Sequence, residues 1–161
     1  EILIGLVGSE MCIRDRAIAD AMGKKLEVDD IDFDSIIPAI TTGKADMSLA
    51  GMTVTDERKE NVDFSDSYAT GVQVIIVPED SDITGPDDLA NDKMIGVQQG
   101  TTGQYYVEGS EEWDFPGLPA KCVTYKSGSL AVQDMLNGNI NYVIIDAAPA
   151  SAITTAINEV Q

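Results

Sequence analysis

Short apolar blocks and polar, helix-like segments follow one another along the chain, and they predict strands and helices in alternation. Apolar runs, several of them rich in β-branched residues, predict strands at residues 1–7, 26–31, 46–50, 73–77, 94–97, 121–125 and 142–145. The segments between them predict helices at 17–22, 34–42, 86–90, 103–108, 130–136 and 148–157, with another beginning at Asp56. Strands that alternate with helices are typical of an α/β protein with parallel sheets and crossover helices.

Glycines and hydroxyl residues mark several of the predicted helix ends. Gly23, Gly43 and Gly138 each follow a helix, where a left-handed residue closes the last turn. Pro38 suits the first turn of its helix, and Ser129 is the expected N-cap of residues 130–136.

The two halves of the chain share a layout. Residues 40–49 and 136–144 each run from a helix through a capping glycine to a polar residue three positions later and then a buried strand. The similarity is too weak for a repeat, but it suggests two similar α/β lobes. We expect lobe 1 at residues 1–70 and lobe 2 at residues 71–161, with the boundary near 68–72.

Polar residues and glycines gather where predicted strands end. Gly51 to Thr53, Gln98 to Thr102 and Asp146 each follow such a strand. Ligands of open parallel sheets bind beyond the carboxyl ends of the strands, so these segments are the expected binding residues.

Residues 49–68 (LAGMTVTDERKENVDFSDSY) combine features that suit a carboxylate. Gly51 allows a ligand to approach the backbone, and Thr53 and Thr55 offer hydroxyl groups. Backbone N–H groups face outward where a turn opens a helix. Arg58, five residues after Thr53, can fold its guanidinium back over the turn. The stretch therefore predicts a carboxylate-binding corner.

A free α-amino acid would match these groups. Arg58 can hold its carboxylate through two parallel hydrogen bonds, joined by the N–H groups of Thr53 and Thr102. Asp146 can pair with its ammonium group, helped by the Gly51 carbonyl and the Thr53 hydroxyl. Phe33, just before a helix, can cover the aliphatic part of the ligand.

Each of these residues also has a purely structural interpretation. Arg58 in Asp-Glu-Arg-Lys-Glu can be a solvated helix charge. Asp146 can be the N-cap of the last helix, and Gly100 to Thr102 can be ordinary helix-start residues. Phe33 can belong to the core. Taken singly, these interpretations are at least as good as the functional ones.

Charge and composition exclude several classes of function. With 10 basic against 28 acidic residues and a net charge of −18, the chain repels nucleic acids and anionic membranes. It contains no histidine, which removes the Ser-His-Asp and Cys-His arrangements and most zinc sites. Cys12 and Cys122 have no metal-binding spacing, and we interpret them as two unrelated thiols. No metal or cofactor is expected.

Several blocks together resemble the family 3 solute-binding proteins of bacterial amino-acid ABC transporters, and the match runs from about Ala17 to the end. The blocks, in family order and spacing, are residues 33–40 (FDSIIPAI), 43–46 (GKAD), 50–58 (AGMTVTDER), 62–66 (VDFSD), 97–102 (VQQGTT) and 144–146 (IID). The resemblance implies a two-lobed, type II periplasmic-binding-protein fold that closes over one amino acid. It also implies the carboxylate and ammonium roles given above. Ala50, Met52, Gln98 and Thr101 would line the pocket, with Phe33 packed on the side chain.

The chain departs from the family at both ends. Residues 5–16 replace an aromatic loop and a Gly-Phe-Asp segment of the family. Ser9 to Arg16 is atypical and is similar to short peptides translated from adapter sequence in assembled reads, so we interpret it as an artefact. Relative to the family, the chain ends before it would cross back to lobe 1. We therefore expect an incomplete binding protein.

The expected function is binding of a polar or basic amino acid and its delivery to an ABC transporter permease. Gln98, instead of a cation, leaves acidic ligands less favoured. We expect a monomer that is not an enzyme and lies outside the cytoplasm, periplasmic or anchored at the cell surface. The printed sequence shows no signal peptide, which in a chain starting at Glu1 does not argue for the cytoplasm. The alternatives are a cyclohexadienyl-dehydratase-like enzyme on the same scaffold and the sensor module of a receptor or kinase.

Overall fold

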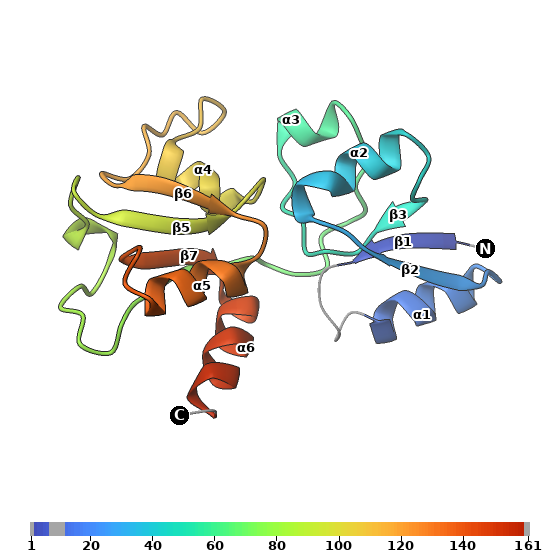
Figure 1. Ribbon diagram of the computed structural model, residues 1–161. Helices are drawn as coiled ribbons and strands as arrows, with labels where there is room; N and C mark the ends of the chain where they lie inside the picture. The colour runs from blue at the N-terminus through green and yellow to red at the C-terminus, as the bar shows by residue number, and fades with distance from the viewer. Residues whose placement is uncertain (1, 7–11, 160–161) are drawn as a thin grey trace. The chain divides into compact units, whose positions relative to one another are not determined.

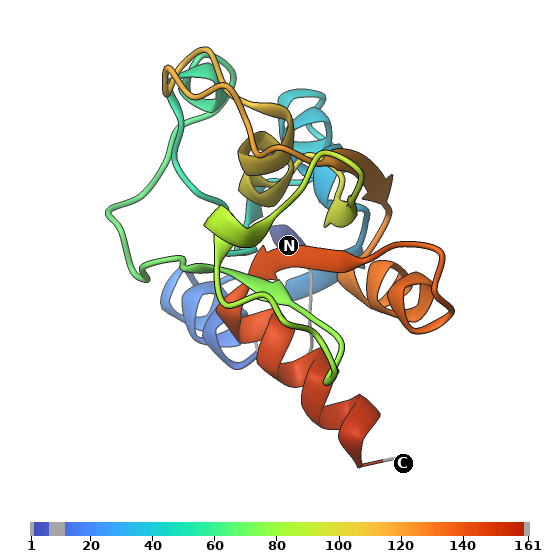
Figure 2. The ribbon, with the colours of Figure 1, turned by 90° about the vertical axis from the view of Figure 1, so that its left-hand side faces the viewer.

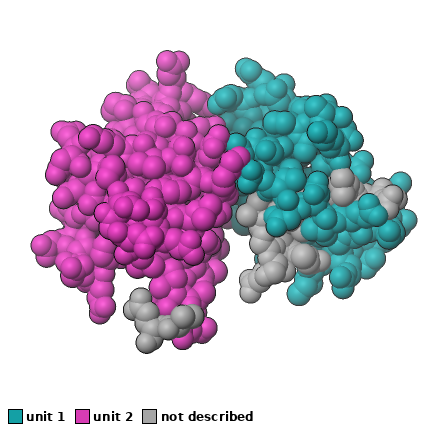
Figure 3. Space-filling view, viewed as in Figure 1, with its two compact units in different colours: residues 1–69 teal, residues 70–161 magenta. Residues whose placement is uncertain are grey.

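The computed structural model describes residues 2–6 and 12–159, and the side chains of residues 13–159. The chain forms two compact units, Glu1–Ala69 (unit 1) and Thr70–Gln161 (unit 2), coloured separately in Figure 3. Each unit has its own sheet.

Unit 1 is built on a three-stranded parallel sheet with the order β2-β1-β3. Parallel pairing confirms the expectation drawn from the strand and helix alternation. The described elements of the unit, in chain order, are β1 (Ile2–Leu6), α1 (Cys12–Ala21), β2 (Leu26–Asp30), the 3₁₀ turn η1 (Phe33–Ser35), α2 (Ile36–Thr41), β3 (Met47–Ser48) and α3 (Asp56–Lys59).

The described core of unit 1 is small. Leu49, just past β3, packs with Ile18 of α1, Leu26 of β2 and Met47 of β3. In Figure 1, α1 covers one face of the sheet while α2 and α3 lie toward the other. The strand leading into residue 50 is shorter than expected, and the helix beginning at Asp56 is a single turn.

The first half of α1 has its polarity reversed. Ile13 is 81% exposed, whereas Asp15 is completely buried, and neither carboxylate oxygen has a hydrogen-bond partner among the described residues. An amphipathic helix places such residues the other way round. Of the atypical stretch Ser9 to Arg16, the first three residues lie outside the described part of the chain, and the rest begin α1.

Unit 2 contains a four-stranded mixed sheet with the order β4-β7-β5-β6. The last three of these strands are parallel, whereas β4 runs antiparallel to β7. The elements are β4 (Gln73–Ile76), the 3₁₀ turn η2 (Pro86–Asp88), β5 (Met94–Gln98), α4 (Thr102–Glu108), β6 (Lys121–Tyr125), α5 (Gly128–Leu136), β7 (Tyr142–Asp146) and α6 (Ala147–Asn158).

Helices cover both faces of this sheet, with α4 on one and α5 and α6 on the other (Figures 1 and 2). Strand β7 shows the consequence: Val143 and Ile145 pack with α5 and α6, while Tyr142 and Ile144 pack on the opposite face near Val107 of α4. Because both faces are covered, the strand is a continuous apolar run rather than an alternating one.

Two local expectations for unit 2 are wrong. The N-cap of α5 is Ser127, whose hydroxyl accepts a hydrogen bond from the Leu130 N–H, and not Ser129. The expected helix at 86–90 is only the 3₁₀ turn η2. The Asp88 carboxylate accepts hydrogen bonds from the N–H groups of Thr84 and Gly85, and these bonds close the turn.

Candidate functional site

The turn after β3 in unit 1 begins at Gly51, the first residue of the predicted carboxylate-binding corner. Gly51 adopts φ +61°, in the left-handed region that favours glycine. Its N–H donates a hydrogen bond to the Tyr68 hydroxyl, 3.1 Å away. The corner is therefore tied to the last residues of unit 1.

Arg58 is buried, with only 5% of its surface exposed. Its guanidinium folds back over the turn, and Nη1 donates to the Thr53 carbonyl at 2.6 Å. The same guanidinium lies 5.8 Å from the centre of the Phe33 ring. Burial of this kind excludes the interpretation of Arg58 as a solvated helix charge.

Thr55 fixes the backbone of Arg58, the residue that carries the guanidinium. It is the N-cap of α3, and its hydroxyl accepts from the Arg58 N–H at 3.2 Å. Thr55 is itself buried, so its hydroxyl serves the helix and does not offer the outward-facing group considered from the sequence. Thr53, by contrast, is exposed.

Unit 1 thus brings together its share of the expected ligand-binding residues. Phe33 and Arg58 are in contact, Arg58 and Thr53 are hydrogen-bonded, and Gly51 lies two residues before Thr53. Phe33, Ala50 and Met52 are half-buried.

In unit 2, Gln98 to Thr102 form the turn from β5 into α4. Gly100 is in the left-handed region at φ +77°, and its N–H donates to the Gln104 side chain at 2.8 Å. The Thr101 hydroxyl donates to the Gln98 carbonyl at 2.7 Å. The Gln98 side chain donates to the Lys126 carbonyl at 3.3 Å. The turn is thus fixed by local hydrogen bonds and by one bond to the segment that follows β6.

Asp146 ends β7 and occupies the N-cap position of α6, but its carboxylate makes no capping hydrogen bond. Instead Oδ1 accepts from the side-chain amide of Gln73 at 2.5 Å. The same Gln73 nitrogen donates to the Thr102 hydroxyl at 3.0 Å. One amide therefore joins the two residues that end β7 and begin α4.

Burial raises the pKa of Asp146. Asp146 is half-buried and has no cationic partner among the described residues, and a carboxylate in this situation favours a ligand that brings a positive charge.

Sequence reasoning missed Gln73. It stands at the start of a β-branched run and looks like an ordinary edge residue. Its position opposite Asp146 depends on the antiparallel pairing of β4 with β7, and no local pattern gives that register.

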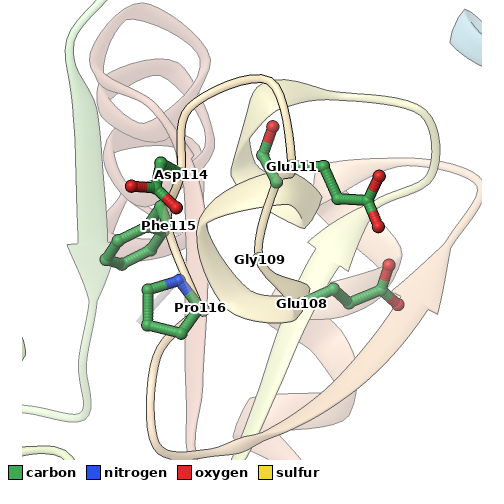
Figure 4. A pocket seen from close by; sticks show the side chains of 7 residues that line it. Glu108, Gly109, Glu111, Asp114, Phe115 and Pro116 are labelled. Atoms are coloured by element: carbon green, nitrogen blue, oxygen red, sulfur yellow. The ribbon is translucent and has the colours of Figure 1, made fainter.

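The loop after α4 lines an open surface hollow of about 400 Å³ in unit 2 (Figure 4). Its lining includes Glu108, Glu111 and Asp114, but none of the residues expected to bind the ligand. In the described part of the chain, no group of acidic residues or cysteines has metal-site geometry.

Cys122 is a free thiol, and the side chain of Cys12 lies outside the described part of the chain. Burial and the charge of Glu108 raise the pKa of Cys122 to about 12. The thiol is therefore neutral at physiological pH. No helix among the described residues is long and apolar enough to span a membrane.

Two α/β units of this kind, each with polar residues at its strand ends, define the class of two-lobed periplasmic binding proteins. The chain belongs to the bacterial extracellular solute-binding proteins, family 3, whose pattern it matches over residues 10–158. Most of the atypical stretch Ser9 to Arg16 thus lies within the match.

Proteins whose names state an amino-acid ligand are similar in sequence to this chain. "Probable histidine-binding protein" of Neisseria gonorrhoeae is 34% identical over 132 residues, which are 82% of this chain and 48% of that protein. The arginine-binding extracellular protein ArtP of Bacillus subtilis is 44% identical over 86 residues, 53% of this chain and 33% of its own length. The chain therefore spans about half, or less, of the length of these relatives.

Solved structures are similar over nearly the whole chain. The substrate-binding protein of an amino acid ABC transporter shares 34% identity and a TM-score of 0.85, covering 98% of this chain and 75% of that one. An ancestral arginine-binding protein bound to arginine shares 33% identity and a TM-score of 0.84, covering 96% and 74%. These neighbours confirm the two-lobed α/β fold class.

Proposed function

We propose that this protein binds a free polar or basic α-amino acid and delivers it to the membrane permease of an ABC transporter. Arg58 would hold the ligand's carboxylate, together with the N–H groups of Thr53 and Thr102. Asp146 would pair with the ammonium group, with the Gly51 carbonyl and the Thr53 hydroxyl beside it. Ala50, Met52, Gln98 and Thr101 would line the side-chain pocket, and Phe33 would cover it.

The burial of Arg58 is the observation that carries this proposal. A guanidinium is costly to bury without a purpose, and this one is held by the Thr53 carbonyl and the Phe33 ring. Its planar fork matches a carboxylate, which accepts two parallel hydrogen bonds.

Charge supports a basic ligand. Unit 2 contains three lysines (Lys93, Lys121 and Lys126) and no arginine, against a large excess of acidic residues. A cationic amino acid is attracted by such a field, and an acidic one is repelled. Relatives named for arginine, and for lysine, arginine and ornithine, point the same way.

Delivery, location and a non-catalytic role belong to the same proposal. The relatives include a periplasmic and an extracellular binding protein, and their names describe binding rather than catalysis. A similar structure is an ancestral amino acid-binding protein titled as a precursor of cyclohexadienyl dehydratase, and it too is named for binding. We propose a monomer in the periplasm or anchored at the cell surface.

Calorimetric titration of the 161-residue chain with each standard amino acid and with ornithine tests the proposal. We expect binding of arginine, lysine, ornithine or histidine in preference to glutamate and aspartate. Replacing Arg58 with alanine should weaken binding by at least roughly 2 kcal/mol, about thirtyfold, because a desolvated charge pair is lost.

Lys59→Ala is the matched control for the Arg58 variant. Lys59 is the next residue, is exposed and pairs with Asp56 at 3.0 Å. Its replacement by alanine removes the same positive charge as the Arg58 variant does. It should leave affinity within about twofold, since exposed pairs contribute little. Equal losses of affinity in both variants would show that Arg58 contributes only its general positive charge. If no amino acid binds more tightly than the millimolar range, the proposed function is rejected.

A further inference from the structure

The side chain of Gln73 lies at the junction of three elements of unit 2. Gln73 begins β4 and is directly opposite Asp146 in the antiparallel pair of β4 and β7. Its amide nitrogen contacts the Asp146 carboxylate at 2.5 Å and the Thr102 hydroxyl at 3.0 Å. Thus β4 supplies a side chain that connects the end of β7 with the start of α4.

The chemistry of these contacts fixes the orientation of the amide. A carboxylate accepts hydrogen bonds and cannot donate them, so the group 2.5 Å from it must be the NH₂ and not the carbonyl. That nitrogen has two hydrogens, and the two contacts use both. The carbonyl oxygen, Oε1, is buried without a hydrogen-bond partner among the described residues.

An unpaired buried carbonyl is unfavourable, so packing alone does not explain why the amide is held here. The neighbouring helix also leaves room for it: a Cβ added at Gly103 would lie 3.1 Å from Gln73 Oε1 and 3.1 Å from the Ile144 carbonyl. The absence of a side chain at Gly103 therefore accommodates the amide in this position.

For Asp146 and Thr102, the structure of residues 2–6 and 12–159 gives no other side-chain donor comparable to Gln73. Asp146 makes no capping bond to α6, and no charged side chain contributes to the shift in its pKa. The Thr102 hydroxyl accepts from Gln73, which leaves its own hydrogen for an acceptor. With Oδ1 held by Gln73, the second oxygen of Asp146 remains as an acceptor.

We propose that Gln73 is a positioning residue of the ligand site, which orients the Asp146 carboxylate toward the ligand's ammonium group and fixes the direction of the Thr102 hydroxyl. This inference rests on the proposed function for the ligand, but the Gln73–Asp146 contact can be tested without one. Gln73 acts through Asp146 and does not itself touch the amino acid.

The decisive variant is Gln73→Met, which keeps the length of the side chain and removes the donor. Gln133→Met, at an exposed position of α5, is the matched control. The first measurement is the pKa of Asp146 by carbon-13 NMR of the ligand-free chain. Loss of a hydrogen bond to the charged form should raise that pKa by about one unit in Gln73→Met and leave it unchanged in the control.

The second measurement is calorimetric, with L-arginine and with its analogue that lacks the α-amino group. Gln73→Met should weaken L-arginine about tenfold and the analogue less than twofold, because only L-arginine offers an ammonium group to Asp146. A merely structural role would weaken both ligands alike.

Gly103→Ala is the second variant if Gln73→Met does not fold, and it should shift both readouts in the same direction by displacing the amide. An unchanged pKa of Asp146, or equal weakening of the two ligands, would overturn the inference. If the unmodified chain does not bind L-arginine, the proposed ligand is wrong, and the NMR measurement still decides whether Gln73 holds Asp146.

Discussion

Replacing Asp15 with alanine should stabilise the protein, although most substitutions of buried residues do the opposite. Asp15 is fully buried in α1, and both of its carboxylate oxygens are without a hydrogen-bond partner among the described residues. Burial raises its pKa. The folded state therefore carries a group that water would solvate better, and removal of that group should favour folding.

The size of the gain follows from opposing contributions. An unpaired buried polar group costs about 1–3 kcal/mol, and more when it is charged. A carboxylate near a helix N-terminus regains roughly 0.3–1 kcal/mol from the helix dipole. Asp20→Ala, at an exposed position in the last turn of the same helix, measures a helix-propensity gain of roughly 0.7 kcal/mol together with the removal of a charge that the helix dipole disfavours there. Asp15→Ala should exceed this control by about 1–2 kcal/mol, or roughly 2–8 °C in Tm.

The pH dependence provides a second test. Because the folded-state pKa of Asp15 lies above its unfolded value of about 3.9, the folded state binds the proton more tightly. Wild-type stability from this group is fully present below pH about 3.9 and is lost as the pH rises through the folded pKa. The advantage of Asp15→Ala over wild type should therefore be smaller in acid and grow toward neutral pH.

Urea unfolding followed by circular dichroism, over a series of pH values, measures these differences. Hydrogen exchange of the Cys12–Ala21 segment localises the effect to α1. If Asp15→Ala is no more stable than Asp20→Ala at neutral pH, the carboxylate is satisfied in solution, and the reasoning from its burial is wrong.

Two further substitutions test the corner of unit 1. Gly51→Ala meets no atom within 4 Å but must adopt φ +61°, so it should cost about 1–2 kcal/mol in urea unfolding; Gly85→Ala, also without a contact and at φ −173°, should cost less than about 0.5. Thr55→Ala removes the cap of α3 and should lower stability by about 0.5–2 kcal/mol and weaken amino-acid binding, while Thr55→Ser should restore both. Unchanged affinity in Thr55→Ala would show that α3 holds Arg58 without its cap.

Much of the fold is readable from local patterns. The runs at 94–98, 121–125 and 142–146 are strands because they are apolar and bounded by turn residues, and the glycines at 23, 43 and 138 adopt the left-handed conformation that ends a helix. Arg58 could be placed over the turn because five residues of backbone fix its reach. These features depend on residues that are neighbours in the sequence, so they can be predicted from the sequence alone.

The atypical start of α1 is visible at both levels. The motifs led us to expect that Ser9 to Arg16 departs from the family, although the family match includes residues 10–16, and the structure shows a buried Asp15 near an exposed Ile13. A segment that fits its environment would place its apolar side chain inside.

The sequence by itself determined the α/β class, the positions of most strands and helices, and the candidate residues at their ends. Tertiary structure alone decided what those residues do locally. The burial of Arg58 shows that its guanidinium is held in place and is not a solvated surface charge. The antiparallel pairing of β4 with β7 places the Gln73 amide against the Asp146 carboxylate, which therefore bonds to Gln73 and does not cap a helix. The physical reason is range: propensity and turn chemistry act over a few residues, whereas burial and hydrogen bonding join residues that are 73 positions apart.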